Sequence, residues 1–262
     1  MAESVQGAQV VGRVARVLRV VARHPAGVSA AVVAQESGLT RPTAHRLLSS
    51  LAAEGLLDAD VRRTRWQLGP ELLVLGTLAA DRYPVVDLAR PRVRALAQAT
   101  GESAFLSVRR GTETVCLLRE EGSFPVRSFV LTEGVRFPLG VASAGLAILA
   151  FAGDAEIDAY LATAELEQAW GAEHAQAAIR HRVAQTRRLG YAVNPGLIVE
   201  GSWGMGAAVF DAGGAPTCAL SLTGIEPRFS PARRPGLGAA LLEQAHLLSR
   251  ALGHEPAVRR GR

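Results

Sequence analysis

The sequence predicts an α+β protein of two domains. The smaller N-terminal domain is helical and ends in a β-hairpin, and the larger C-terminal domain has a mostly antiparallel sheet flanked by helices. Three observations predict this fold class. Apolar residues recur at helical spacing through much of residues 9–54. Strand-like stretches surround a central run of helical segments in residues 104–223. Basic residues outnumber acidic ones mainly in the first quarter of the chain.

The composition fits two modest domains and argues against several classes of protein. The chain has 262 residues, of which 48% are hydrophobic, enough to fill two cores. Cys116 and Cys218 have neither metal-binding nor redox spacing, so we interpret them as buried free thiols. We find no membrane span and no signal peptide, so we expect a cytoplasmic protein. We expect neither a metal nor a cofactor.

The charge is distributed unevenly along the chain. Residues 1–70 hold nine arginines against five acidic residues, whereas residues 71–262 hold 20 arginines against 19 acidic residues. A basic N-terminal domain is typical of a protein that binds a polyanion. The near-neutral remainder of the chain would then have a different task.

The first three helices are expected at residues 9–24, 30–37 and 40–54. Ser29 and Thr40 are expected N-caps, because their hydroxyls can accept hydrogen bonds from the first free N–H groups of a helix. Gly38 and Gly55 are expected to end the second and third helices. The short turn between these two helices has the spacing of a helix-turn-helix.

A β-hairpin with a basic tip is expected after the third helix, with strands at residues 56–57 and 66–68. A hairpin that follows a helix-turn-helix is a wing, and the arginines near its tip suit a nucleic acid backbone. A further helix follows the wing. The predicted domains are residues 1–69 as a winged helix-turn-helix, residues 70–81 as a linker helix and residues 82–262 as the second domain.

The third helix divides into an apolar face and a polar face. Ala44, Leu47, Leu48 and Leu51 recur at helical spacing and would pack on the first two helices. The other face would present basic and polar side chains to the DNA major groove, as a recognition helix does. The alternative is a solvated amphipathic helix of a small helical domain. The predicted DNA-binding residues are Ser29, Thr40, Arg41, Pro42, Thr43, His45, Arg46, Ser49, Ser50, Arg62, Arg63 and Arg65.

The second domain is expected to group its strands around a central run of helices. The expected helices are residues 85–100, 143–151, 172–189 and 236–252. The expected strands are residues 104–108, 114–119, 126–131, 191–194, 206–210 and 218–223. Residues 211–214 supply a hairpin turn between the last two strands.

Two features of this domain are typical of a small-molecule site. Ser221 and Thr223 alternate with large apolar residues, so both hydroxyls lie on one face of a strand. Ser143 lies at the start of a helix whose free N–H groups would suit a carboxylate. The alternatives are that the two hydroxyls are solvent-exposed, and that Ser143 only caps its helix.

A series of short motifs runs in order through residues 9–252. They are Thr43-Ala44-His45-Arg46-Leu47-Leu48, Leu68-Gly69-Pro70, Leu88-Ala89-Arg90-Pro91, Ala144-Gly145, Gly190-Tyr191-Ala192-Val193 and Ala219-Leu220-Ser221-Leu222-Thr223-Gly224. Each motif alone is modest, but their colinear order is specific. In these motifs the chain resembles the isocitrate lyase regulator (IclR) family of bacterial transcription factors.

The resemblance implies a winged helix-turn-helix, a linker helix that pairs subunits, and an effector domain with a GAF-like fold. The implied partners are double-stranded operator DNA, further copies of the chain in a homodimer or homotetramer, and a small organic acid; no membrane is implied. Residues 201–206 are more glycine-rich than the family pattern, which predicts a roomier or more apolar site, such as one for an aromatic acid. Carried over by position, the effector pocket would involve Val126, Phe129, Phe137, Ser143, Ala144, Asn194, Ser202, Gly204, Ser221 and Thr223.

These observations favour a ligand-responsive transcription regulator, a repressor rather than an activator, over two alternatives. An architectural DNA-binding protein would leave the larger domain without a task. An enzyme with a DNA-binding appendage has little support, because Ser143 is not at the centre of a Gly-x-Ser-x-Gly motif. His174 and His181 are too far apart on one helix to chelate a metal, and we expect both to be solvated.

Overall fold

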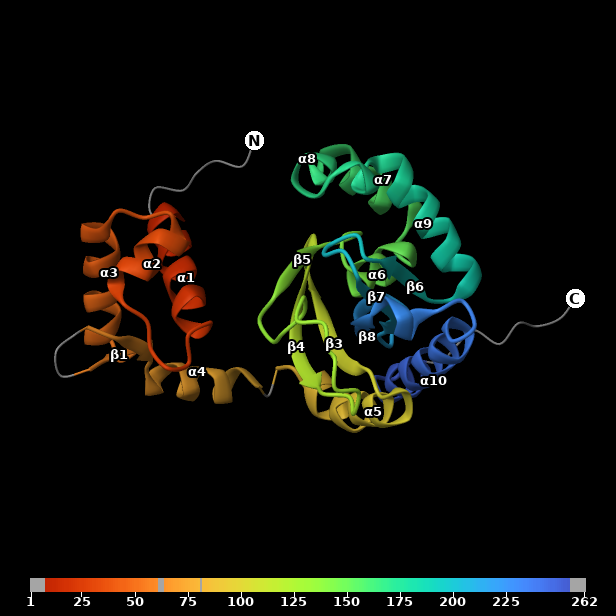
Figure 1. Cartoon of the computed structure of the whole chain (residues 1–262), viewed down its shortest axis with the longest axis horizontal. Coiled ribbons are helices and arrows are strands. Elements are labelled where there is room, and N and C mark those ends of the chain that lie inside the picture. Colours follow the sequence, from red (N-terminus) through yellow and green to blue (C-terminus); the bar gives the residue numbers. More distant parts are fainter. Residues whose placement is uncertain (1–7, 61–63, 81, 255–262) are drawn as a thin grey trace, which may run out of the picture. The chain divides into compact units, whose positions relative to one another are not determined.

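The structure is a computed structural model that describes residues 8–60, 64–80 and 82–254 (Figure 1). The chain divides into two compact units, Met1–Tyr83 and Pro84–Arg262. Within the described residues, no helix is both long enough and apolar enough to cross a membrane.

The first unit begins with helices α1 (Ala8–Ala22), α2 (Ala30–Ser37) and α3 (Arg41–Ala53). The predicted N-caps lie at the starts of α2 and α3. The Val32 N–H donates to the Ser29 hydroxyl, and the Thr43 N–H donates to the Thr40 hydroxyl, each at 3.4 Å. Gly38 ends α2 with a φ of 67°, which glycine adopts without steric cost. The predicted helix-turn-helix is confirmed.

A two-stranded hairpin completes the core of this unit. Strand β1 (Leu57–Ala59) pairs antiparallel with β2 (Trp66–Leu68), and Val28 forms an isolated bridge to Trp66. The Trp66 side chain is fully buried in the same core as Val17 and Leu48, so the hairpin is packed against the helices. Arg62 and Arg63, predicted for its tip, lie outside the described residues.

Helix α4 (Pro70–Ala80) follows the hairpin and buries none of its side chains. Its start is tied to the first unit, because the Gly69 N–H donates to the Leu56 carbonyl at 2.9 Å. Gly69 also approaches the Gly55 carbonyl so closely that an added Cβ would lie 2.2 Å from its oxygen. This contact fixes where α4 leaves the wing.

The second unit contains a six-stranded antiparallel sheet in the order β5-β4-β3-β8-β7-β6. The strands are β3 (Ser103–Arg110), β4 (Glu113–Glu120), β5 (Arg136–Pro138), β6 (Ala192–Pro195), β7 (Ser202–Phe210) and β8 (Pro216–Ile225). The predicted α+β class with a mostly antiparallel sheet is confirmed.

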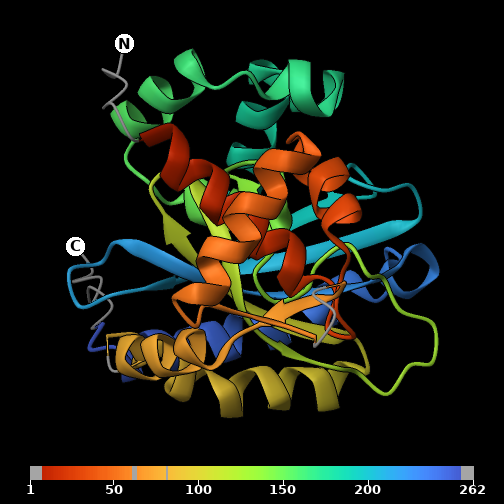
Figure 2. The same cartoon turned by 90° about the vertical axis from the view of Figure 1, so that its left-hand side faces the viewer.

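Helices cover both faces of this sheet (Figures 1 and 2). One face packs against α5 (Val85–Thr100) and α10 (Arg234–Ala251), and the other packs against α6 (Ser143–Ala150) and α9 (Gln176–Leu189). The alternation along β8 sorts side chains between the two cores. Leu220 and Leu222 belong to the α5–α10 side, whereas Ala219 belongs to the α6–α9 side.

One predicted strand is wrong. Residues 126–131 form no strand; they belong to a long connection between β4 and the short strand β5. The edge of β4 pairs with β5 instead, with Glu113 opposite Pro138. The Cys116 backbone also exchanges hydrogen bonds with Gly134 and Val135, which occupies the adjoining part of that edge. The apolar residues 126–131 therefore form no strand, because the edge of β4 that they could have paired with is already occupied.

The helical region between the two halves of the sheet is more divided than predicted. The expected helix at residues 172–189 is split into η1 (Ala172–His174) and α9, because Ala175 has an extended ψ of 149°. Two helices, α7 (Asp154–Thr163) and α8 (Leu166–Trp170), were not predicted. α8 has only five residues, too few for helical periodicity to identify.

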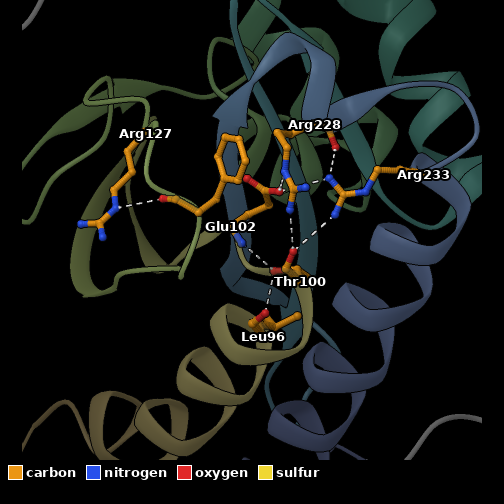
Figure 3. A network of polar contacts seen from close by, with 7 residues as sticks. Leu96, Thr100, Glu102, Arg127, Arg228 and Arg233 are labelled. Atoms are coloured by element: carbon orange, nitrogen blue, oxygen red, sulfur yellow. Dashed lines mark hydrogen bonds and ion pairs between the residues drawn. The ribbon is translucent and has the colours of Figure 1, made fainter.

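A buried ion-pair network joins the end of α5 to the start of α10 (Figure 3). The Glu102 carboxylate is 2% exposed and accepts from Arg228 Nε at 2.6 Å and Arg233 Nη1 at 3.2 Å. Both arginines also donate to the Thr100 carbonyl at 3.3 Å. Arg228, in η2 (Glu226–Phe229), lies 4.4 Å from the Phe124 ring centroid. Paired charges here replace the water that a buried carboxylate would otherwise need.

Leu48→Ala is expected to destabilise the first unit by about 2–5 kcal/mol, because Leu48 is fully buried and its removal leaves a cavity between the helices and Trp66. Val10→Ala is the control, since Val10 is 53% exposed in the same unit. Urea denaturation of both variants, followed by circular dichroism, measures the difference. Equal stability of the two variants would contradict the described core.

Candidate functional site

The exposed face of α3 carries a compact group of basic and polar side chains. Arg41, His45, Arg46 and Ser50 are exposed, and so is Pro42 in the first turn of the helix. Neither arginine forms an ion pair with a carboxylate of the described residues. The opposite face is buried in the helical core, as predicted. Two unpaired cations on one exposed face make it suitable for phosphate groups.

Four of the predicted DNA-binding residues have structural roles or are only partly accessible. Ser29 and Thr40 cap α2 and α3, and the Thr40 hydroxyl also bonds to that of Thr43 at 2.9 Å. Thr43 is partly buried. The Ser49 hydroxyl is buried and has no partner within the described residues. The accessible part of the predicted interface therefore centres on the arginines and His45.

The base of the wing is held by one carboxylate. Asp60 accepts from the Thr64 N–H and from the Thr64 hydroxyl, each at 2.6 Å, and from the Arg65 N–H at 3.2 Å. The hydrogen bonds from Thr64, which exceed the opposing effect of desolvation, lower the pKa of the Asp60 carboxyl below its usual range. Arg65 is exposed, and its guanidinium donates to the Gly27 carbonyl at 3.1 Å.

A cavity in the second unit lies between the start of α6 and the sheet face that α6 covers. A volume of about 30 Å³ is open to the centre of a water molecule, which is room for very few waters. Its polar lining consists of hydroxyls and one amide, and no ionisable side chain lines it. The lining residues are Ser107, Thr114, Val130, Leu131, Phe137, Ala142, Ser143, Ala144, Asn194, Ile198, Ser202, Trp203, Gly204, Ser221 and Thr223.

Two hydroxyls of this cavity have no hydrogen-bond partner. Ser221 is fully buried and Thr223 is 9% exposed. The Ser221 Oγ and the Thr223 Oγ1 are both buried and unpaired within the described residues. The predicted alternation places both side chains on the cavity side of β8, and they are not solvent-exposed. A buried unpaired hydroxyl costs roughly 1–3 kcal/mol, so a ligand that bonds to both would remove this cost.

Glycines in β7 allow α6 to begin directly against the sheet. A Cβ at Gly206 would lie 2.8 Å from the Ser143 carbonyl oxygen, and one at Gly204 would lie 3.1 Å from the Ser143 hydroxyl. Ser143 is the first residue of α6 and not its cap, because the N-cap position is held by Ala142. The first N–H groups of α6 lack acceptors within the helix and adjoin the cavity.

Most of the predicted effector residues line this cavity, but Val126 and Phe129 do not. These two are 53% and 72% exposed on the connection between β4 and β5. Val130 and Leu131 of the same connection line the cavity in their place. Which residues of this connection reach the cavity depends on the path of the loop, and strand periodicity could not predict that path. We expected a roomier or more apolar site from the glycine-rich run. The run gives close packing of α6 and a narrow cavity, and the absence of ionisable side chains from its lining fits the more apolar alternative.

Two of the predicted polar residues already have partners. The Asn194 amide donates to the Val141 carbonyl at 2.7 Å, and its oxygen accepts from the Leu197 N–H at 3.0 Å. The Ser202 hydroxyl bonds to that of Ser128 at 2.5 Å. These bonds shape the cavity wall. Sequence reasoning missed Ser107 and Thr114, although both fall within predicted strands.

The expectation that His174 is solvated is wrong. His174 is 1% exposed, and its Nδ1 lies 3.0 Å from the Trp170 carbonyl. Desolvation lowers its pKa, with a smaller opposing effect of the hydrogen bond to Trp170. His181 is exposed on α9. Among the described residues, no group of three or more His, Cys, Asp or Glu side chains could hold a metal ion.

Comparison with known proteins identifies the family. Residues 77–250 match the family described as bacterial transcriptional regulator IclR C-terminal, and residues 10–61 match the IclR helix-turn-helix domain. The chain belongs to the IclR family. Its relatives are transcriptional regulators and not enzymes.

Curated relatives align along most of this IclR-family chain. It is 30% identical over 224 residues to the HTH-type transcriptional regulator BhcR of Paracoccus denitrificans, which covers 85% of this chain and 80% of the relative. It is 26% identical over 254 residues to the HTH-type transcriptional repressor AllR of Salmonella paratyphi A, which covers 97% of this chain and 93% of the relative.

Solved structures share the fold. An IclR homologue from Microbacterium hydrocarbonoxydans, in complex with 4-hydroxybenzoate, has a TM-score of 0.72 at 25% identity and covers 92% of this chain and 98% of its own. The IclR of Thermotoga maritima has a TM-score of 0.74 at 23% identity, which covers 94% of this chain and all of its own.

Gly206→Ala is expected to destabilise the second unit, because the added Cβ would meet the backbone of Ser143 and Ala144 and displace the start of α6. A loss of about 1–3 kcal/mol is the usual cost of overpacking. Gly236→Ala in α10 is the matched control, since nothing lies within 4 Å of its added Cβ. Thermal denaturation compares them, and an unchanged melting temperature for Gly206→Ala would refute the close approach.

Proposed function

We propose that this IclR-family regulator binds operator DNA through α3 and the wing, as a dimer or dimer of dimers, and represses transcription under the control of a small organic acid. The observation that carries the DNA part is the exposed face of α3, where Arg41 and Arg46 have no carboxylate partner among the described residues. Arginine donates in a geometry that matches phosphate oxygens and guanine edges.

The exposed surface of α4 supports self-association. Leu73, Val74, Leu75 and Leu78 are each 49–74% exposed, and no side chain of this helix is buried. A helix of eleven residues is too short to be stable in water without packing partners. A second copy of the chain, which presents the same apolar helix, would cover this surface symmetrically. Paired heads would then contact two half-sites of an operator.

The cavity beside α6 supports the effector part of the proposal. Its unpaired hydroxyls at Ser221 and Thr223 can bond to a carboxylate, and the positive end of α6 favours a negative charge. Phe137 and Leu131 offer an apolar wall for the rest of the ligand. The complex of a homologue with 4-hydroxybenzoate is consistent with an aromatic acid. The narrow cavity must open for such a ligand, and a ligand that prefers the open form would shift the conformational equilibrium.

Arg46→Ala is expected to weaken operator binding by about 1–3 kcal/mol, because under this proposal it removes a side chain that bonds to a base edge. The operator is obtained by selection from random duplexes, and fluorescence anisotropy measures its affinity at several salt concentrations. Arg250→Ala, at the exposed end of α10, is the control and is expected to bind as the unmodified protein does. Binding that does not depend on salt would contradict phosphate contacts.

Thr223→Val is expected to weaken effector binding roughly tenfold without destabilising the protein, because it removes an unpaired buried hydroxyl and keeps the side-chain shape. A thermal-shift screen of aromatic and short-chain acids finds the effector; at 100 times its dissociation constant, a ligand stabilises by about 2.7 kcal/mol. Thr217→Val is the control, an exposed position on the same strand. Identical shifts in all three proteins would place the ligand elsewhere.

A further inference from the structure

A groove lies on the opposite side of β6 and β7 from the effector cavity. Side chains alternate along these strands, so Val193 packs on the α5–α10 side, whereas Asn194 and Gly204 line the cavity. Trp203 borders both the groove and the cavity. Helix α9 and the first turn of α10 also border the groove. A volume of about 360 Å³ is open there to the centre of a water molecule, far more than in the cavity.

Two arginines line this groove, and no acidic side chain does. Arg182 comes from α9, and Arg234 is the first residue of α10. Neither forms an ion pair with a carboxylate of the described residues, whereas Arg180 and Arg187 of α9 pair with carboxylates of α7. The groove therefore holds two positive charges that the described part of the chain leaves uncompensated by ion pairs.

Both guanidinium groups also contain nitrogen atoms that lack a hydrogen-bond acceptor. Arg182 donates through Nη2 to the Glu173 carbonyl at 2.8 Å, but its Nε and Nη1 are buried without a partner. The Nε of Arg234 is likewise buried without a partner. Burial lowers the pKa of Arg182, and the nearby Glu173 opposes this shift. An anion in the groove would compensate the two positive charges, and it would supply acceptors to these costly unpaired donors once the guanidinium groups turn toward it.

The floor of the groove is apolar and partly aromatic. Leu189, Val193 and Trp203 line it together with the ring of Tyr191. The Arg234 guanidinium lies 5.1 Å from the Trp203 ring centroid. This cation–π contact places a positive charge beside a flat apolar surface, where a planar ligand body can pack. A groove with apolar walls and few convergent polar groups is typical of a small-molecule site.

We propose that this groove is a second ligand site, separate from the effector cavity, that binds an aromatic carboxylate. The carboxylate is bound by Arg182 and Arg234, and the aromatic body packs on Leu189, Val193 and Trp203. Gln185, which lies between Arg182 and Leu189 along α9, adds an uncharged hydrogen-bonding side chain. No ionisable side chain lines the effector cavity, so that site would bind a ligand through hydroxyls and helix N–H groups, whereas the groove would bind it through arginines.

Isothermal titration calorimetry of the full-length protein with three probes tests the ligand class. 2-Naphthoate carries both the anion and the planar body, 2-naphthalenemethanol carries only the body, and inorganic phosphate carries only the anion. We expect 2-naphthoate to bind about tenfold or more tightly than either other probe, because each of them loses one set of contacts. Equal affinity for 2-naphthalenemethanol would overturn the proposal.

Three substitutions then locate the site. Arg182→Gln and Arg234→Gln are each expected to weaken 2-naphthoate binding roughly tenfold, since each removes a positive charge and its charge-assisted hydrogen bond to the carboxylate. Gln185→Glu keeps both arginines but adds a carboxylate that competes with the ligand, so it is also expected to weaken binding. Arg188→Gln removes an exposed arginine of the same helix that does not line the groove, and should bind as the unmodified protein does.

Two results would overturn this assignment. If 2-naphthoate bound only in the effector cavity, its affinity would be the same in all four variants, because none of these residues lines that cavity. If the groove were instead covered by a second copy of the chain, Arg182→Gln and Arg234→Gln would change the oligomeric state in sedimentation equilibrium while leaving 2-naphthoate binding intact. Circular dichroism of each variant confirms that it is folded before titration.

Discussion

The close approach of β7 to the start of α6 is the contact on which the second unit depends. A Cβ at Gly206 would lie 2.8 Å from the Ser143 carbonyl oxygen and 3.0 Å from the Ala144 nitrogen, so a side chain there would require α6 to shift. The contact brings the free N–H groups of α6 to the same face of the sheet as the hydroxyls of Ser221 and Thr223. If residue 206 of β7 carried a side chain, α6 would move away from the sheet and the cavity would lose its helical wall.

The alternation of side chains along β6, β7 and β8 decides which residues face each side of the sheet. One face receives the core under α5 and α10, and the other receives the core under α6 and α9. Strands β6 and β7 thus border a narrow cavity on one side and a wider basic groove on the other. The buried Glu102 network holds the start of α10, and with it one border of the groove, against the end of α5.

The DNA-binding unit follows a simpler logic, because its parts are specified by residues close together in the chain. Ser29, Thr40 and Gly38 fix the ends of α2 and α3 through local hydrogen bonds and backbone conformation. Leu48 and its neighbours then orient α3 by burying one face, which leaves Arg46 on the other. The position of the exposed face of α3, which we propose binds DNA, is therefore set by capping and periodicity.

The sequence by itself determined the features that depend on local periodicity: the two-domain α+β class, the capped helices and the shared strand face of Ser221 and Thr223. Only the tertiary structure decided which distant segments meet. It placed Val130 and Leu131, and not Val126 and Phe129, in the cavity, because the path of residues 121–135 depends on pairing of β4 with β5. It likewise buried His174 and brought Arg182 beside the same groove as Arg234, since burial and charge proximity arise from packing between helices that no local pattern encodes.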